Sequence, residues 1–192
     1  MDPRIAVESD VDHIAAVLAD AFFDDPIMAW ALPDIEARPR RLQAMFGYVA
    51  QHVYIGHRRC QTSEEAVALW LPAGVTMGDE FWEEHGLPFA EALDGDVERL
   101  AALGNAMGEH HPGDPHLYLL AIGVRPSAQG RGHGGDLLAK ALERADAEGE
   151  AAYLEATSPR SRVLYQRHGF EAVGEFSVDG SPPMWPMWRH PR

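Results

Sequence analysis

The chain has 192 residues, of which 46% are hydrophobic and 24% charged, and its formal net charge is −14. This size and composition predict one globular domain, residues 1–192, rather than two domains of ordinary size. The negative charge argues against nucleic-acid backbones and anionic membranes as partners. No run of about 18 apolar residues predicts a transmembrane helix. The polar N-terminal residues lack an apolar signal core, so we expect a cytoplasmic protein.

The first part of the chain predicts a short strand, two helices and a buried strand. Residues Arg4 to Glu8 indicate the short strand, and Ser9 is expected to cap an amphipathic helix. The sequence Asp24-Asp25-Pro26 ends that helix. A second helix is expected from about Arg40 to Val53, and the run Ala66 to Leu71 predicts a buried strand.

Residues 76 to 112 predict two further short helices, because aromatic and aliphatic residues recur there at helical spacing. Met77, Phe81 and Trp82 could line a substrate cavity, although such side chains at this spacing more often fill a core. The single cysteine, Cys60, has no partner for an internal disulfide. We interpret it as a small, half-buried residue near a strand rather than a catalytic thiol.

The order of elements is clearest after residue 115. Leu117 to Val124 is an almost continuous apolar run, as expected for a central strand covered on both faces. A helix from Gly132 to about Gly149 and a strand from Ala151 to Ala156 complete a βαβ crossover, which makes the two strands parallel. The remaining expected elements are a helix from Pro159 to His168 and a closing antiparallel pair of strands, residues 171–178 and 184–189.

A glycine cluster lies between the central strand and the helix that follows it. The segment reads Val124-Arg125-Pro126-Ser127-Ala128-Gln129-Gly130-Arg131-Gly132-His133-Gly134-Gly135. The start of a helix has backbone N–H groups without an intrahelical partner and carries a partial positive charge. Glycines let several of these N–H groups converge on one anion. The cluster therefore predicts a site for a phosphate or pyrophosphate.

Three kinds of phosphate-binding loop are rich in glycine, and two of them fit poorly. A mononucleotide loop ends in Gly-Lys-Ser/Thr, which this loop lacks. A dinucleotide loop fits in spacing, since Gly130, Gly132 and Gly135 satisfy G-x-G-x-x-G and Glu155 lies 20 residues further on. Its first glycine should follow the strand directly, whereas Arg125 to Ala128 intervene, and too few residues remain for a doubly wound sheet. The third kind, a loop for the pyrophosphate of an acyl-CoA, suits the longer approach to the helix.

Two motifs support this third interpretation. The residues Gln129-Gly130-Arg131-Gly132-His133-Gly134 match Q/R-x-x-G-x-G/A, the coenzyme A signature of the GNAT superfamily of N-acetyltransferases, which the chain resembles. The segment Leu154 to Phe170 resembles the family's pattern of a strand, a loop, a polar residue four positions before a tyrosine, and Gly-Phe. The likeness covers residues 115 to 178 and extends more loosely to the N-terminal helix. The segments that look like puromycin N-acetyltransferase and its relatives are Ala21 to Pro26, Leu154 to Arg160 and Tyr165 to Phe170.

The resemblance implies an α/β (α+β) fold of the GNAT kind: a mixed, mostly antiparallel central sheet with a parallel V-shaped splay and helices on both faces. It also implies acetyl-CoA as co-substrate and direct acetyl transfer to a primary amine. Ser161 stands where the family usually has asparagine, and its hydroxyl has a shorter reach toward a pantetheine amide. The residues expected to bind coenzyme A are Ile122, Gly123, Val124, Gln129, Gly130, Arg131, Gly132, His133, Gly134, Gly135, Ser161 and Tyr165.

The expected roles of these residues follow from their place in the motif. The N–H groups of Gly130 to Gly135 would hold the pyrophosphate, with Arg131 adding positive charge. Ile122 and Val124 would pair with the pantetheine arm like an added strand. Gly123 would permit a bulge or a close approach at the end of that strand.

The expected catalytic residue is Tyr165. A phenol with a pKa near 10 stays protonated at neutral pH and can protonate the departing thiolate. The general base is left open, because the strand Leu117 to Ile122 contains no acid. His116, Tyr118 and Glu155 are the candidates.

No metal site is expected. His110, His111 and His116 lie close together in the sequence, but no acid or cysteine completes a ligand spacing. A solvated loop explains them more simply.

The sequence therefore predicts an acetyl-CoA-dependent N-acetyltransferase that acts on the primary amine of a small molecule by direct attack on the thioester. Two alternatives stay open: a protein or peptide N-acetyltransferase, and a non-catalytic acyl-CoA-binding sensor. The acceptor amine and the oligomeric state are also open. Trp185 and Trp188 on the last strand are candidates for the edge of a homodimer.

Overall fold

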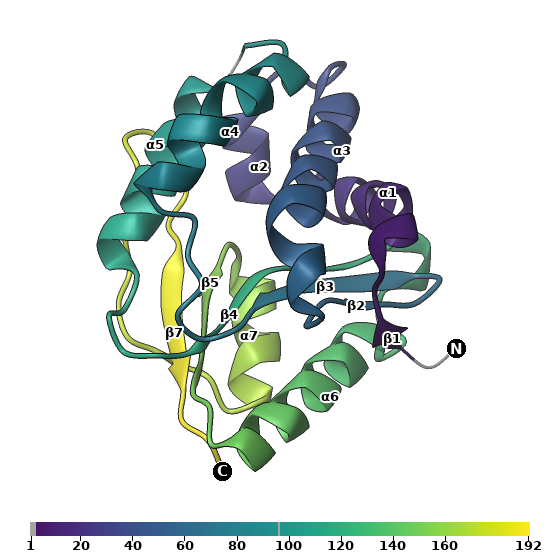
Figure 1. Ribbon diagram of the computed structural model, residues 1–192, viewed down its shortest axis with the longest axis vertical. Helices are drawn as coiled ribbons and strands as arrows, with labels where there is room; N and C mark the ends of the chain where they lie inside the picture. Colours follow the sequence, from purple (N-terminus) through teal and green to yellow (C-terminus); the bar gives the residue numbers. More distant parts are fainter. Residues whose placement is uncertain (1–2, 96) are drawn as a thin grey trace.

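A computed structural model describes residues 3–95 and 97–192 as one seven-stranded sheet with helices on both faces (Figure 1). The strands follow the order β1-β2-β3-β4-β5-β7-β6, and β4 and β5 are the parallel pair. All other neighbouring strands are antiparallel. The expected mixed, mostly antiparallel sheet is confirmed. The strands are β1 (Arg4–Ile5), β2 (Gln61–Thr62), β3 (Ala66–Leu71), β4 (Leu117–Val124), β5 (Ala152–Ala156), β6 (Glu171–Ala172) and β7 (Trp185–Arg189).

The helices divide the buried side chains into two cores, one on each face of the sheet. On one face α1 contributes Ile14, Val17 and Leu18. On the other face α6 contributes Leu137 and Leu138, together with Trp70 of β3, which is fully buried. No helix in the described ranges is both long and apolar enough to cross a membrane. The helices are α1 (Val11–Phe22), α2 (Pro26–Ala31), α3 (Arg38–Val49), α4 (Asp79–Ala92), α5 (Glu98–His110), α6 (His133–Glu148) and α7 (Pro159–Arg167), with short turns η1 (Glu8–Asp10), η2 (Ala50–Tyr54, a π-helix), η3 (Ile55–His57) and η4 (Pro126–Ala128).

The parallel strands β4 and β5 separate along their length. Leu117–Leu119 pairs with Ala152–Leu154, and the second half of β4 has no strand partner on that side among the described residues. On the other side of β4, Leu69 pairs with Ala121 and Trp70 pairs with Leu119, which leaves Leu120 as a bulge. A bulge bends and twists its strand. The sheet thus contains the V-shaped opening expected from the sequence.

Gly123 allows α1 to lie directly on β4. A Cβ at this position would lie 2.8 Å from both Ala21 Cβ and Leu18 Cδ2. The close approach expected at Gly123 is therefore real, but its partner is helix α1, and the bulge lies at Leu120 instead.

Replacing Gly123 with alanine is expected to destabilise the protein by about 1–3 kcal/mol, because the added methyl group overpacks this contact. Gly104 of α5 supplies a control, since a Cβ there would meet nothing within 4 Å. Gly104→Ala should leave stability unchanged or raise it by up to about 1 kcal/mol. Urea unfolding of the two variants measures both effects. Equal stabilities of the two variants would contradict the packing described here.

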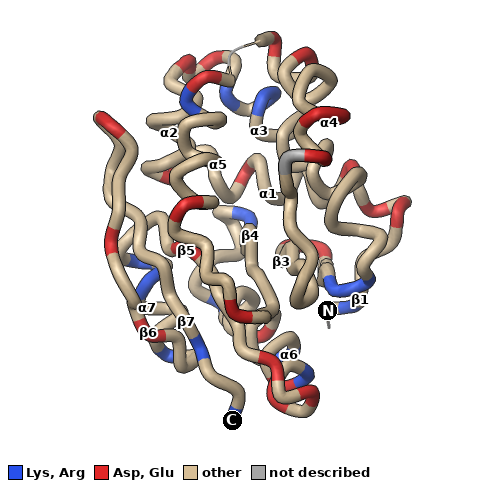
Figure 2. The backbone as a smooth tube through the Cα atoms, turned by 60° about the vertical axis from the view of Figure 1, so that its left-hand side comes forward, with Lys and Arg blue, Asp and Glu red and all other residues tan. Residues whose placement is uncertain are grey.

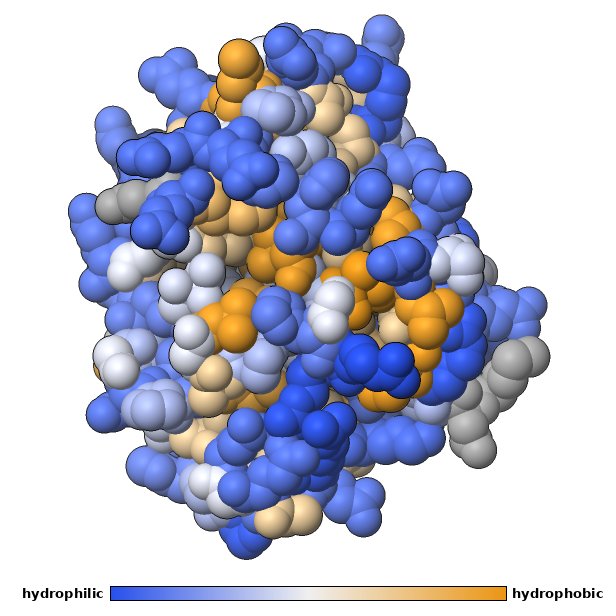
Figure 3. Space-filling model, in the orientation of Figure 1, coloured by the Kyte–Doolittle hydropathy of each residue, from blue (hydrophilic) through white to orange (hydrophobic). Residues whose placement is uncertain are grey.

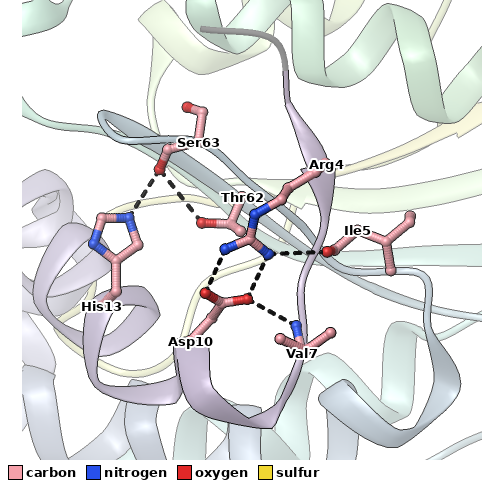
Figure 4. A network of polar contacts seen from close by, with 7 residues as sticks. All are labelled: Arg4, Ile5, Val7, Asp10, His13, Thr62 and Ser63. Atoms are coloured by element: carbon pink, nitrogen blue, oxygen red, sulfur yellow. Dashed lines mark hydrogen bonds and ion pairs between the residues drawn. The ribbon is translucent and has the colours of Figure 1, made fainter.

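Two expectations about the N-terminal helices are wrong. Ser9 does not cap α1. It lies within η1, and α1 has Asp10 at its N-cap with no side-chain cap bond. The Asp10 carboxylate instead pairs with Arg4 through two hydrogen bonds of 2.6 and 2.7 Å and accepts the Val7 amide (Figure 4). A bidentate charged pair of this kind is stronger than a neutral hydroxyl cap.

A short helix was also missed after α1. Asp25 ends the turn after α1 and at the same time caps α2, because its side chain accepts the amides of Ile27 and Met28. Pro26 occupies the first position of α2, where its missing N–H costs nothing. The expected first strand is shorter than predicted and ends at Ile5, and the expected strand over 171–178 reduces to β6 and a bridge between Phe176 and Met184.

Candidate active site

The loop between β4 and α6 depends on two glycines in the left-handed region. Gly130 has φ +78°, and Gly132, the N-cap of α6, has φ +94°. A Cβ at either position would meet no atom within 4 Å. Glycine is therefore favoured here by backbone conformation rather than by crowding.

The backbone amides of the glycine cluster, Gly130 to Gly135, differ from those before and after it. Before the cluster, the Ala128 amide donates to the Arg125 carbonyl at 2.9 Å, and after it the Asp136 amide donates to the Gly132 carbonyl at 3.0 Å. In the described part of the chain, the N–H groups of Gly130 to Gly135 donate to no protein acceptor, and no side chain caps the helix. They lie at the positive end of a helix of 16 residues. This arrangement can hold a diphosphate.

The polar side chains of the loop differ in what they contact. The Gln129 amide donates to the Val124 carbonyl at 3.1 Å and so holds the loop against the end of β4. Arg125 forms an ion pair with Asp20 of α1. Arg131 is exposed in the loop, and its contact with a bound anion stays a prediction.

The last two glycines of the cluster bring α6 close to α7. A Cβ at Gly134 would lie 3.6 Å from Val124 Cγ2 and 3.7 Å from Leu164 Cδ2. At Gly135 it would lie 3.5 Å from the His168 ring. These are ordinary contact distances, so the two positions tolerate a small side chain better than Gly130 and Gly132 do.

Tyr165 lies on the inner side of α7 and is buried. Its ring packs against Phe170, with ring centroids 6.0 Å apart. Burial raises the pKa of Tyr165 well above its ordinary value, and the carboxylates of Asp25 and Glu155 raise it further. The phenol therefore stays protonated at neutral pH and can donate a proton.

Glu155 of β5 is the first residue beyond the last pair between β4 and β5. Its Oε2 accepts the Tyr118 hydroxyl at 3.0 Å, whereas Oε1 has no hydrogen-bond partner in the residues described. Burial raises the pKa of Glu155 to about 7, although the hydroxyls of Tyr118 and Tyr153 lower it in part. A carboxylate with a free oxygen and a pKa near neutrality has the properties of a general base.

His116, another candidate from the sequence, is engaged elsewhere. Its Nδ1 lies 2.7 Å from the Asp114 carbonyl and its Nε2 lies 3.1 Å from His111 Nε2. Burial, together with the neighbouring His116, lowers the pKa of His111 to about 4. No group of three or more potential metal-ligating side chains occurs among the described residues.

Asp25 was not named as a site residue from the sequence. Its Oδ1 accepts two amides in the first turn of α2, and its Oδ2 accepts the Thr157 hydroxyl at 2.5 Å. Burial raises the pKa of Asp25, and its hydrogen bonds oppose this rise. The carboxyl thus joins α2 to the loop that connects β5 to α7. Its membership of the segment Ala21 to Pro26 was the only signal for it in the sequence.

The Ser161 hydroxyl already forms hydrogen bonds at the N-terminus of its own helix, α7. Ser158 caps α7 and accepts the Ser161 amide at 3.1 Å, while the Ser161 hydroxyl donates to the Ser158 carbonyl at 2.9 Å. The two serines form a capping box. A contact from Ser161 to a pantetheine amide stays a prediction, and it would compete with this box.

Solved structures with the same fold include several acetyltransferases. A structure from Corynebacterium glutamicum, described as histone acetyltransferase HPA2 and related acetyltransferase, is 29% identical, covers 100% of this chain and 98% of its own, and has a TM-score of 0.75. The polyamine N-acetyltransferase of Drosophila melanogaster is 18% identical over 98% of each chain, with a TM-score of 0.63. At that identity the second likeness concerns the fold alone.

Comparisons of the amino-acid sequence with known proteins also indicate an acetyltransferase. The model of the Acetyltransferase (GNAT) family matches residues 53–170, and the chain belongs to this family. An uncharacterized N-acetyltransferase of Schizosaccharomyces pombe is 26% identical over 84% of this chain and 70% of that protein. The mycothiol acetyltransferase of Beutenbergia cavernae is 34% identical over 54% of this chain and 34% of its own length. The protein is therefore an acetyltransferase, and the narrower likeness to puromycin N-acetyltransferase stays a prediction.

Proposed function

We propose that residues 1–192 act as one domain that transfers the acetyl group of acetyl-CoA to the primary amine of a small molecule by direct attack on the thioester. The observation that carries this proposal is the row of free amides from Gly130 to Gly135 beside the opening between β4 and β5. A diphosphate at these amides and an extended arm along the unpaired half of β4 fit the same surface. Bound acetyl-CoA supplies an acetyl group activated as a thioester.

Two buried side chains each carry out one of the two proton transfers of the reaction. Glu155, with its free Oε1 and a pKa of about 7, accepts a proton from the ammonium group of the substrate, and the neutral amine then attacks the thioester. Tyr165, whose pKa is raised, remains protonated and donates to the sulfur of the leaving group. Asp25 positions the loop after β5 through Thr157.

A small acceptor is favoured over a peptide. Glu155 and Tyr165 are 8% and 7% exposed, so a slender amine reaches them more easily than a chain with backbone on both sides. Solved relatives of the same fold are described as acting on polyamines, agmatine and arylalkylamines. The net charge of −14 also favours a cationic substrate.

A turnover screen tests this proposal. Agmatine, spermidine, tyramine and a lysine-containing peptide are incubated separately with acetyl-CoA, and the release of free thiol is followed. We expect at least one small amine to raise thiol release clearly above hydrolysis. Turnover of the peptide alone would contradict the proposal for a small acceptor.

The pH dependence tests the role of Glu155. A base works only when it is deprotonated, and burial raises the pKa of Glu155 to about 7. We therefore expect kcat/KM to rise with pH and to level off above about 7, which gives a break in the pH profile near pH 7. In Glu155→Gln this break should disappear and kcat should fall by about 100-fold. Glu171→Gln, at an exposed position on β6, serves as the control and should keep both the break and the rate. A break near pH 7 that persists in Glu155→Gln would assign the base elsewhere.

A further inference from the structure

A cavity lies away from the glycine loop, between the β1–β2 edge and α6. It has a volume of about 360 Å³. Arg4 of β1, Arg59, and Lys140 and Arg144 of α6 are among its ten lining residues, and none of the ten is acidic. The whole chain has only 16 lysines and arginines in 192 residues, so four in ten is a strong local excess. Figure 3 shows this face, with strongly hydrophilic side chains over α6 and beside β1.

Acidic residues outside the cavity hold these cations in place without using all of their donors. Asp10 binds Arg4 through two hydrogen bonds (Figure 4). Arg59 is 13% exposed and gives only its Nη2 group to Glu148 and Glu150. A guanidinium carries five N–H donors, so further donors remain on both arginines.

The α6 cations also keep donors. Arg144 gives its Nε to Glu148 at 2.8 Å, and Lys140 gives one hydrogen to the Pro3 carbonyl at 2.9 Å. Arg59 and Arg144 share two carboxylates, Glu148 and Glu150, and Asp10 pairs with Arg4, so Lys140 is the cation of the four that no acid among the described residues neutralises. The cavity therefore favours a ligand with negative charge.

Two buried polar atoms on residues of the cavity wall lack partners among the described residues. They are the indole Nε1 of Trp70, which is fully buried, and the Oε1 of Gln61, which is 6% exposed. An indole N–H is a donor only, and an amide oxygen is an acceptor only. Buried polar groups without partners are uncommon and call for an explanation. Both atoms are closed to solvent in this structure, so a ligand that offers an acceptor and a hydroxyl donor satisfies them only with a small shift of these side chains.

We propose that this cavity binds a small hydroxycarboxylate with more than one negative charge. Its carboxylates bind the cations and the Trp70 N–H, its hydroxyl donates to Gln61, and its short carbon skeleton lies against Leu117 of the apolar wall. This site is separate from the acetyl-transfer site and does not depend on the proposed function.

Nuclear magnetic resonance with citrate as the probe tests the proposal directly. The chain has five tryptophans, so the indole N–H peak of Trp70 is identified by its loss in Trp70→Phe. Citrate should shift this peak to a saturating value. Lys140→Gln and Arg59→Gln should each weaken citrate binding by about tenfold. Arg40→Gln, which removes an exposed cation from α3, should leave it unchanged.

Two further ligands fix the chemistry of the site. Tricarballylate, which is citrate without its hydroxyl, should bind more weakly than citrate. Inorganic phosphate should bind more weakly still. An unmoved Trp70 peak at about 10 mM citrate, a concentration that detects even millimolar affinity, would overturn the proposal. Equal weakening in Arg40→Gln would do so too, because it would indicate general ionic attraction, and tighter binding of phosphate than of citrate would reject a carboxylate ligand.

Discussion

Replacing Tyr165 with phenylalanine should lower kcat for acetyl transfer by about 100-fold and leave the fold and the KM for acetyl-CoA almost unchanged. The change removes one hydroxyl and keeps the ring that packs against Phe170. The lost hydroxyl is the proton donor that we propose, and burial with the carboxylates of Asp25 and Glu155 raises its pKa. Without it, the thiolate must leave unprotonated or take a proton from water.

Steady-state kinetics with a responsive amine measure this effect. Tyr48→Phe is the matched control, since Tyr48 lies on α3 and its hydroxyl contacts His85 at 2.9 Å. The control should retain its rate. A Tyr165→Phe variant within about twofold of the parent would remove Tyr165 from the chemistry. A parent protein that binds acetyl-CoA but turns over no amine would favour the sensor alternative.

Replacing Gly132 with valine should weaken coenzyme A binding by about 100-fold. A β-branched residue does not tolerate φ +94°, so the chain must leave the conformation in which its amides converge. The added side chain meets no neighbouring atom within 4 Å of its Cβ. The protein should therefore still fold, at a cost of about 1–2 kcal/mol.

Gly149→Val controls for this strain. Gly149 caps the other end of the same helix with φ +69°, and a Cβ there also meets nothing within 4 Å. Both variants should lose similar stability in thermal unfolding, but only Gly132→Val should lose affinity in calorimetric titration with coenzyme A. Equal affinities of the two variants would show that the loop does not bind the ligand.

The C-terminal half of the fold was predictable because its signals are local. The apolar runs of β4 and β5, the glycine cluster and the amphipathic face of α6 all lie within about 40 residues, and α7 begins at Pro159 as expected. Apolar periodicity of this strength indicates the type of element reliably. The parallel pairing of β4 and β5 then followed from the short crossover.

The wrong predictions for helices α1 and α2 arose where one side chain suits two different contacts. Asp10 and Ser9 both suit a helix start, and only the position of Arg4 in space decides that Asp10 pairs with it. Asp25-Pro26 ends a helix in some contexts and begins one in others. Local pattern does not separate these outcomes, because tertiary contacts choose between them.

Some features of the candidate site were likewise predictable from the sequence, and others were not. The free amides were predictable, because glycines before a helix leave them without partners. The packing of Gly123 against α1 and the engagement of Ser161 with Ser158 were not, since each residue also suits a ligand contact. Asp25 is separated from Thr157 by most of the chain, so their hydrogen bond has no sequence signal.

The most direct test of the account is the behaviour of the loop amides when coenzyme A binds. Two-dimensional ¹H–¹⁵N spectra resolve the backbone N–H groups of Gly130 to Gly135, which the protein itself leaves without acceptors. Titration with coenzyme A should move these signals farthest, in the direction of stronger hydrogen bonding. If the ligand binds and these six amides keep their free positions, the glycine loop does not hold the diphosphate and the proposed orientation of the thioester is wrong.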